Sequence, residues 1–189
     1  MRPLGEPSCQ IRPLILRTTA PDFWTSTSIA SLAAHGVRQF LDLRTDREVG
    51  ETRPPPAFAA AGVQWKWAPI DSRSYLAPES SAADYAAAYI GMVLGNRSAF
   101  ADVFGAIADF GGAPFAFGCR HGRDRTGVVA ALVRYLLGIT ADDIGGASKL
   151  FLESLQARFG GMEAALRAIG IDPIIAQTIR AAYHATKLG

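Results

Sequence analysis

One stretch constrains the fold more than any other: a short apolar run, a polar loop and a long apolar run, in that order. Residues 113–117 read Ala-Pro-Phe-Ala-Phe and indicate a buried strand, and residues 127–137 carry apolar side chains nearly all round and predict a buried helix. Between them, residues 119–127 read Cys-Arg-His-Gly-Arg-Asp-Arg-Thr-Gly, here named the cysteine loop. Free N–H groups and the helix dipole favour anions at such a place, so the pattern predicts a phosphate site.

The cysteine loop also carries groups suited to phosphate chemistry. We expect Cys119 to be a thiolate nucleophile, because a helix N-terminus and flanking cations favour the ionised thiol. Arg125 can give phosphoryl oxygens a two-pronged hydrogen bond, and the Thr126 hydroxyl is placed to donate to the sulfur. Gly122 and Gly127 let the backbone turn and approach the anion closely. The competing explanation is a basic surface turn with a buried cysteine; a nucleotide-binding P-loop fits poorly, because its glycine-lysine motif is absent.

At these residues the chain resembles the cysteine-dependent tyrosine phosphatase superfamily. Within it the chain is similar to the bacterial tyrosine and atypical dual-specificity group, whose loop reads His-Cys-x-Ala-Gly-Lys-Asp-Arg-Thr-Gly. Residues 40–48 are similar to the Asp-Leu-Arg-x-x-x-Glu segment of the bacterial group, and residues 15–18 to the end of its N-terminal strand. The resemblance implies a metal-independent phosphomonoester hydrolase that needs no cofactor and forms a phosphocysteine intermediate.

Two aspartates compete for the general acid that protonates the leaving oxygen. In the resembling bacterial group the aspartate inside the loop is proposed for that role, and it matches Asp124, our first choice. Asp71 follows a predicted strand and could swing over the site. For both, a capping or turn role is the other explanation. Asp42 and Arg44 are expected to be structural, either bonding the loop backbone or balancing Arg125.

Three departures from the family pattern change what the resemblance implies. Gly118 stands where the family has a histidine that orients the cysteine, which predicts a less acidic or less rigidly held thiol and lower activity. His121 replaces alanine and Arg123 replaces lysine, so that together with Arg120 they form a cationic rim. This rim either solvates the loop or recognises a second anionic group. The region after Gly138 is shorter than usual, so lid or membrane-contact functions are not carried over.

Composition excludes several other classes of protein. The 189 residues are 49% hydrophobic and 19% charged, as in a globular enzyme domain. The formal charge of +2 and the lack of a Lys/Arg-rich tract argue against nucleic-acid binding. His35, His121 and His184 are scattered, so no metal cluster is expected.

The cellular compartment of the protein is predicted from its apolar segments and its cysteines. No apolar run is long enough to span a membrane, and the N-terminus lacks a hydrophobic signal region, so we expect a cytoplasmic protein. Cys9 is expected in a loose N-terminal arm over residues 1–11. A regulatory disulfide between Cys9 and Cys119 is the less favoured possibility.

Predicted strands and helices alternate along the chain. Strands are expected over 13–17, 38–43, 63–68 and 113–117, and helices over 25–35, 83–94, 99–110, 127–137, from 140, over 162–168 and over 173–183. A proline run at 52–56 breaks the pattern. The order predicts one α/β domain over 1–189: a three-layer α/β/α tyrosine-phosphatase-like fold with a short, mostly parallel central sheet and a helical C-terminal third. Five aromatic residues either border the pocket or, as is more typical of such residues, lie in the core: Trp65, Trp67, Tyr75, Tyr85 and Tyr89.

The expected substrate is a small anionic phosphate ester, such as a nucleotide, sugar phosphate or phosphoinositide. The cationic rim and the short C-terminal third favour this class slightly over phosphotyrosine proteins. Two alternatives stay open: a protein tyrosine or dual-specificity phosphatase, and a catalytically weak pseudophosphatase that binds phosphorylated partners.

Overall fold

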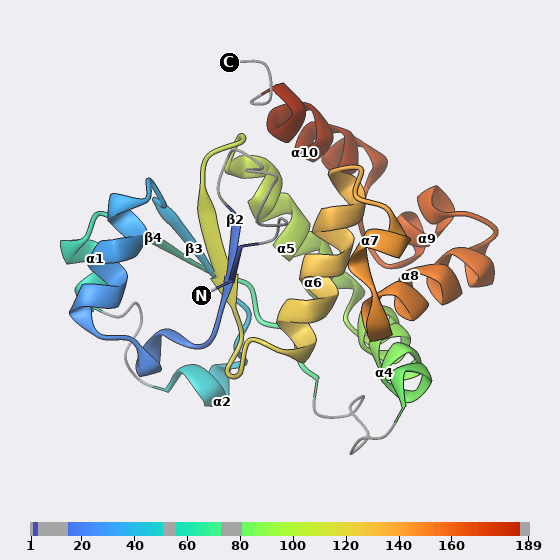
Figure 1. Cartoon of the computed structure of the whole chain (residues 1–189), viewed down its shortest axis with the longest axis horizontal. Coiled ribbons are helices and arrows are strands. Elements are labelled where there is room, and N and C mark those ends of the chain that lie inside the picture. The colour runs from blue at the N-terminus through green and yellow to red at the C-terminus, as the bar shows by residue number, and fades with distance from the viewer. Residues whose placement is uncertain (1, 4–14, 51–55, 73–80, 186–189) are drawn as a thin grey trace.

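A short sheet forms the centre of the molecule (Figure 1). The computed structural model describes residues 2–3, 15–50, 56–72 and 81–185. Four strands run parallel in the order β2 (Ile15–Thr18), β5 (Phe115–Gly118), β3 (Gln39–Asp42) and β4 (Gln64–Trp67). At one edge β1 (Arg2–Pro3) pairs antiparallel with β2. Since parallel neighbours need crossover connections, helices must cover both faces of this sheet.

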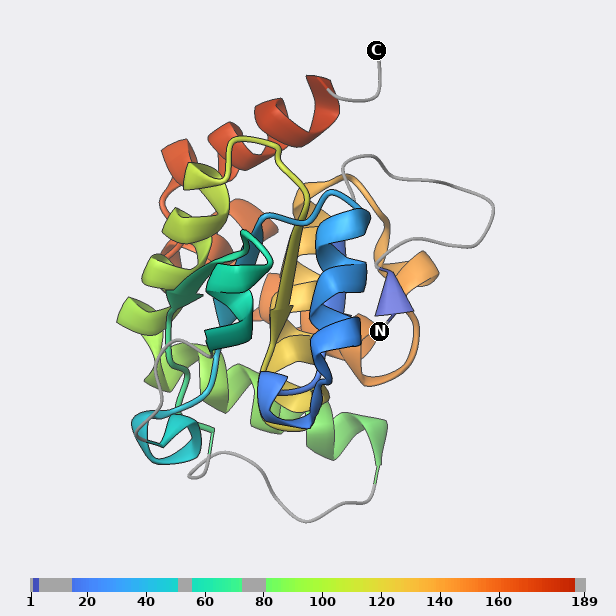
Figure 2. The same ribbon diagram turned by 90° about the vertical axis from the view of Figure 1, so that its left-hand side faces the viewer.

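One face of the sheet is covered by α1 (Ser26–Ala34) and α3 (Pro56–Ala60). Figure 2, which looks onto this face, shows both helices in front of the strands. Alternation along the strands turns every second side chain this way. The buried residues that meet here are Leu16, Ile29, Leu32, Val37, Phe40, Phe58, Val63 and Ala116.

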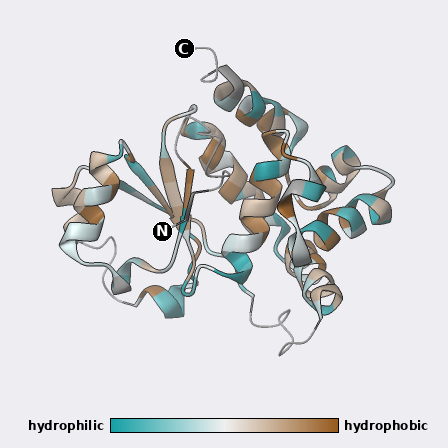
Figure 3. Ribbon diagram, viewed as in Figure 1, coloured by the Kyte–Doolittle hydropathy of each residue, from teal (hydrophilic) through white to brown (hydrophobic). Residues whose placement is uncertain are grey.

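The opposite face is covered by a thicker helical layer. Helices α5 (Arg97–Asp109) and α6 (Asp124–Leu136) contribute buried side chains to the cluster that holds the sheet residues Ile15, Leu41, Phe115 and Phe117. The remaining helices of this layer are α4 (Ala82–Gly95), α7 (Ala141–Ile144), α8 (Gly146–Phe159), α9 (Met162–Ala168) and α10 (Pro173–Ala185). Figure 3 shows hydrophobic and hydrophilic residues alternating along α8, as in a helix with one face packed and one exposed. The three-layer α/β fold with a mostly parallel sheet and a helical C-terminal part is confirmed.

Some boundaries differ from the prediction. Helix α6 begins at Asp124 instead of Gly127, because its first turn is polar and the apolar pattern detects only the turns that follow. Four short segments were not predicted: β1, which pairs with β2 although residues 1–11 were expected to form a loose arm, η1 (Pro21–Phe23), α2 (Asp46–Val49) and α3. The helix expected from residue 140 is split into α7 and α8 at Gly145, whose φ is 71°.

Several expectations concern residues outside the described ranges. The proline run at 52–56 falls there except for Pro56, and so does most of the N-terminal arm, including Cys9. Among the helices of the described ranges, none is long and apolar enough to cross a membrane.

Candidate active site

The cysteine loop joins β5 to α6 and is held in place by β2 and the residues after it. Arg17 Nη2 donates to the Gly122 carbonyl over 3.0 Å, and the Ala20 amide donates to the Arg120 carbonyl over 3.1 Å. Gly122 has a φ of 65°, and a Cβ atom there would lie 2.4 Å from the Thr18 carbonyl oxygen. Only glycine satisfies both the left-handed backbone and this close approach.

Cys119 lies at the start of this loop as a free thiol and is only 3% exposed. The Thr126 hydroxyl donates to Cys119 Sγ over 3.1 Å and accepts from the Cys119 amide over 3.0 Å. The predicted contact between the hydroxyl and the sulfur is therefore present. Thr126 is fully buried, and its hydroxyl thus contacts Cys119 at both the sulfur and the backbone amide.

Gly118 leaves no space for a side chain. A Cβ atom there would lie 2.6 Å from both the carbonyl oxygen and Oγ1 of Thr18, the residue paired with it on β2. Thr18 Oγ1 in turn donates to the backbone carbonyls of Thr19 and Phe117 over 3.0 and 3.3 Å. A histidine at residue 118 does not fit beside this threonine without a backbone shift, and the hydrogen bond to the sulfur in this structure comes from Thr126.

Arg125 is clamped by a carboxylate from α2. Its Nη1 and Nη2 donate to the two carboxylate oxygens of Glu48 over 2.5 and 2.6 Å, and Nη1 also approaches the carbonyls of Leu43 and Ile70. Burial works to lower the pKa of Arg125, but the bond to Glu48 and the charge of nearby Cys119 outweigh it and raise this pKa. The guanidinium is permanently charged and aligned beside the sulfur.

Glu48 also closes the capping box of α2. Its Oε2 accepts from both the amide and the hydroxyl of Thr45 over 2.9 Å. Burial works to raise the pKa of Glu48, whereas the hydrogen bonds from Arg125 and Thr45 lower it, to about 2. One carboxylate therefore caps the N-terminus of α2 and orients Arg125 at the same time.

Asp42 and Arg44 form a buried pair next to this site. Arg44 Nε donates to Asp42 Oδ1 over 3.0 Å and Nη2 to Oδ2 over 2.7 Å, while Nη1 bonds Asp22 of η1. Trp65 Nε1 of β4 donates to the same carboxylate over 3.1 Å. Neither predicted role, bonding the loop backbone or balancing Arg125, is supported by a hydrogen bond of these side chains among the described residues. The carboxylate that bonds Arg125 is Glu48.

Each candidate acid is next in the sequence to Arg125 or to one of its hydrogen-bond partners. Asp124 is the first residue of α6 and is half-buried, and Tyr89 Oη of α4 donates to its Oδ1 over 3.2 Å. Asp71 follows Ile70, whose carbonyl accepts from Arg125. The backbone of Asp71 is fixed by Asn96, whose amide side chain bonds its N–H and its carbonyl over 3.2 and 2.9 Å.

The outer side of the cysteine loop is cationic. Arg120, His121 and Arg123 are exposed, and neither arginine side chain bonds another side chain in the described parts of the chain. The amides from Arg120 to Thr126 likewise have no acceptor among the described residues. Gly127, also predicted to line the site, is buried in the first turn of α6. The loop that begins at Cys119 thus carries unbonded amide donors and exposed positive charge.

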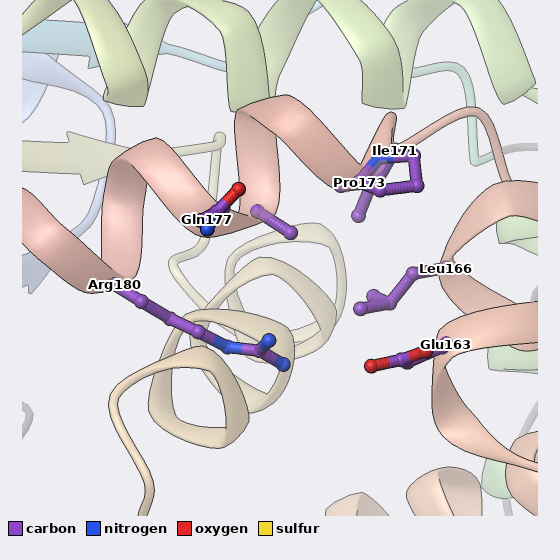
Figure 4. A pocket seen from close by; sticks show the side chains of 7 residues that line it. Glu163, Leu166, Ile171, Pro173, Gln177 and Arg180 are labelled. Carbon is purple, nitrogen blue, oxygen red and sulfur yellow. The ribbon is translucent and has the colours of Figure 1, made fainter.

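A separate cavity of about 280 Å³ lies between α9 and α10. Figure 4 shows the carboxylate of Glu163 and the guanidinium of Arg180 on opposite sides of it. Its lining includes none of the predicted site residues. Within the described ranges no three His, Cys, Asp or Glu side chains gather to form a metal site.

Two residues at the site were not assigned a role from the sequence. Glu48 could have been found, since Thr-x-x-Glu at 45–48 is a capping-box pattern and also lies in the family segment. Tyr89 is one of the aromatic residues expected either at the pocket or, more typically, in the core, and no pattern links it to Asp124. The ring is buried while its hydroxyl reaches Asp124.

A comparison with models of known protein families matches most of the chain. Residues 7–146 match the model described as the tyrosine phosphatase family, a span that includes β2, the cysteine loop and α6. A search of curated proteins finds no significant match.

Proposed function

The chain belongs to the tyrosine phosphatase family and is a phosphatase, and on that premise we propose that it hydrolyses phosphate monoesters through a phosphocysteine intermediate on Cys119. The arrangement that carries this proposal is the sulfur bonded by Thr126 and faced by the charge of Arg125, which Glu48 holds in place. A nucleophile, a fixed cation and free amides thereby meet at one helix N-terminus, where the negative charge of a phosphoryl group is most stabilised.

In the first proposed step Cys119 Sγ attacks phosphorus in line. The sulfur–phosphorus bond forms while the phosphorus–oxygen bond to the leaving group breaks, and its electron pair stays on the leaving oxygen. Asp124 gives that oxygen a proton, with Asp71 as the second candidate. Arg125 and the loop amides stabilise the charge on the equatorial oxygens.

In the second step water attacks the phosphocysteine. The aspartate that gave up its proton takes one from this water, the sulfur–phosphorus bond breaks, and the thiolate is restored. One ester and one water give one alcohol and one phosphate, without any redox change. The protein groups in this route are the side chains of Cys119, Arg125 and the aspartate, together with the loop amides.

The test is hydrolysis of an aryl phosphate in the presence of a chelator. We expect Cys119→Ser to abolish turnover, while the wild-type enzyme forms a trapped phosphoenzyme on rapid acid quench. Turnover retained by this variant contradicts the covalent route. Asp124→Asn and Asp71→Asn are compared to identify the general acid. The variant that lacks this acid hydrolyses esters with poor leaving groups more slowly.

We propose a small anionic phosphate ester as the substrate. The support is the exposed cationic rim of Arg120, His121 and Arg123, which suits a ligand with a second anionic group. Arg120→Ala/Arg123→Ala is expected to lower kcat/KM for an inositol or sugar bisphosphate by about tenfold and for phenyl phosphate by less than about twofold. Phosphopeptides turned over far faster than every nucleotide, sugar phosphate and inositide support protein phosphatase activity instead.

A catalytically weak phosphate-binding protein is the second candidate, and it rests on Gly118 in the histidine position. A burst of alcohol without turnover, or binding without any burst, favours it. The thiol chemistry requires a reducing compartment, which fits the cytoplasm.

A further inference from the structure

Tyr89 of α4 is fixed so that its hydroxyl meets Asp124. The phenol is 8% exposed and donates to Asp124 Oδ1 over 3.2 Å. Its ring packs edge-on against Phe151 of α8, with the ring centroids 6.0 Å apart. Because this hydroxyl bonds one carboxylate oxygen, the other oxygen, Oδ2, has no hydrogen-bond partner among the described residues.

We infer that Tyr89 is a positioning residue that holds the Asp124 carboxyl in the orientation for proton transfer, and this inference rests on the proposed function. As the phosphorus–oxygen bond breaks, the proton passes from Asp124 Oδ2 to the leaving oxygen while Tyr89 stays bonded to Oδ1. When water attacks the phosphocysteine, the same oxygen takes up the proton that water releases. Tyr89 neither gains nor loses a proton over the cycle.

The surroundings keep the phenol in the role of donor. Burial and then the charge of Asp124 raise the pKa of Tyr89 well above its ordinary value, and Tyr85 acts in the same direction. Arg17 of β2 opposes them. Because Tyr89 stays protonated through the working range of an enzyme, Asp124 always has this donor available.

The charged groups on the helices and the loop around Tyr89 and Asp124 do not compete for the hydrogen bond between these two side chains. On α8, Lys149 bonds Asp142 of α7 and lies 3.8 Å from Glu153, so these charges pair with one another. On the loop side Arg125 is turned to Glu48, and Arg123 is exposed. Among the described side chains, Tyr89 alone forms a hydrogen bond with the Asp124 carboxylate.

The experiment compares leaving groups in Tyr89→Phe, which keeps the ring that packs on Phe151. Phenyl phosphate has a poor leaving group that needs the acid, whereas 2,4-dinitrophenyl phosphate leaves without it. We expect kcat for phenyl phosphate to fall about tenfold and kcat for the activated ester to change by less than about twofold, with KM unchanged for both. Tyr135→Phe is the matched control: its hydroxyl bonds no described residue, and both esters should react as in wild type.

The double variant Tyr89→Phe/Asp124→Asn separates this inference from the proposed function. If Tyr89 acts through Asp124, the double variant is no slower than Asp124→Asn alone. Equal losses for both esters, no loss for either, or a further loss in the double variant overturns the inference. Only turnover by Cys119→Ser overturns the covalent route itself, so the two failures are distinct.

Discussion

At the scale of single residues, the carboxylate of Glu48 sets where Arg125 points. Glu48→Gln keeps the shape but removes the charge that holds both guanidinium nitrogens. We expect kcat/KM for an aryl phosphate to fall about 10- to 100-fold, because a misdirected cation no longer matches the phosphoryl oxygens. Glu163→Gln on the exposed face of α9 makes the same chemical change and should leave kcat/KM as in wild type. An unaltered kcat/KM in Glu48→Gln contradicts the role of Glu48 in orienting Arg125.

The same carboxylate makes stability depend on pH. The Glu48 pKa is lowered from 4.5 to about 2, so the folded state favours the ionised form. This stabilisation is complete above about pH 5 and is lost as pH falls towards 2. Urea unfolding at pH 6 and pH 3 should show that wild type loses on the order of 1–2 kcal/mol more over this interval than Glu48→Gln. Parallel losses contradict the assignment.

Gly118 is expected to tolerate no side chain. A Cβ atom 2.6 Å from a backbone oxygen forces β2 and β5 apart, so Gly118→Ala should lower the free energy of unfolding by about 1–3 kcal/mol. Gly105 provides the contrast, since it lies within α5 and a Cβ atom added there would meet nothing within 4 Å. Gly105→Ala should raise the free energy of unfolding by up to about 1 kcal/mol. Urea unfolding of the two variants tests both signs, and a neutral Gly118→Ala contradicts the close approach.

These residues also mark what a sequence can and cannot predict. Cys119 and Thr126 follow from a local pattern, because their contact lies within the cysteine loop. The turn at Gly122 is local too, with a φ of 65°, but its close approach to Thr18 of β2 is not. The partners of Arg125 and Asp124 come from α2 and α4, and no local rule links those segments to the cysteine loop. Gly118 was noticed as a departure, but its reason lies across the sheet on Thr18.

At the scale of elements, the ion pair of Asp42 and Arg44 ties three segments together. Arg44 is 1% exposed and Asp42 is fully buried, and their bonds extend to η1 through Asp22 and to β4 through Trp65. Trp67 Nε1 also donates to the Arg44 carbonyl over 2.8 Å. The end of β3 is thereby locked to its neighbours, close to where Arg125 approaches the Leu43 carbonyl.

Neutralising one partner should destabilise this junction strongly. Asp42→Asn leaves a buried guanidinium with only Asp22 to balance it, and we expect a loss of about 3 kcal/mol in urea unfolding. The double variant Asp42→Leu/Arg44→Met removes both charges and should be more stable than the single one. Lys149→Ala, which breaks the exposed ion pair with Asp142, should leave the midpoint of urea unfolding unchanged. A double variant as unstable as the single one contradicts this account.

Helix α6 explains why element boundaries were missed. Apolar periodicity predicts its buried turns from Gly127, but the helix begins at Asp124 with no side-chain cap. Its first turn holds Asp124, Arg125 and Thr126, all of which point to partners at the site. A helix whose first residues serve a site offers no hydrophobic signal there, so its start could not be placed from the pattern.

At the scale of the whole molecule, the C-terminal helices share the core of the sheet. The family match ends at residue 146, yet Phe151, Ile179 and Tyr183 belong to the same buried cluster as Phe115. The rings of Tyr183 and Phe115 lie 6.1 Å apart. At Gly112, a Cβ atom would lie 2.7 Å from the Ala182 carbonyl oxygen, which shows how closely α10 approaches the start of β5.

This shared core predicts that α10 cannot be removed. A chain ending at Asp172 loses the buried side chains of Ala176, Ile179 and Tyr183 and uncovers Phe115, and each large core truncation typically costs about 2–5 kcal/mol. The total is comparable to the stability of a typical domain, so we expect no cooperative thermal transition and no aryl phosphatase activity. A chain ending at Ala185 keeps α10 and should unfold in one transition, as one domain over 1–189 requires. A cooperative, active chain ending at Asp172 instead means that the sheet and α1 to α9 fold without α10.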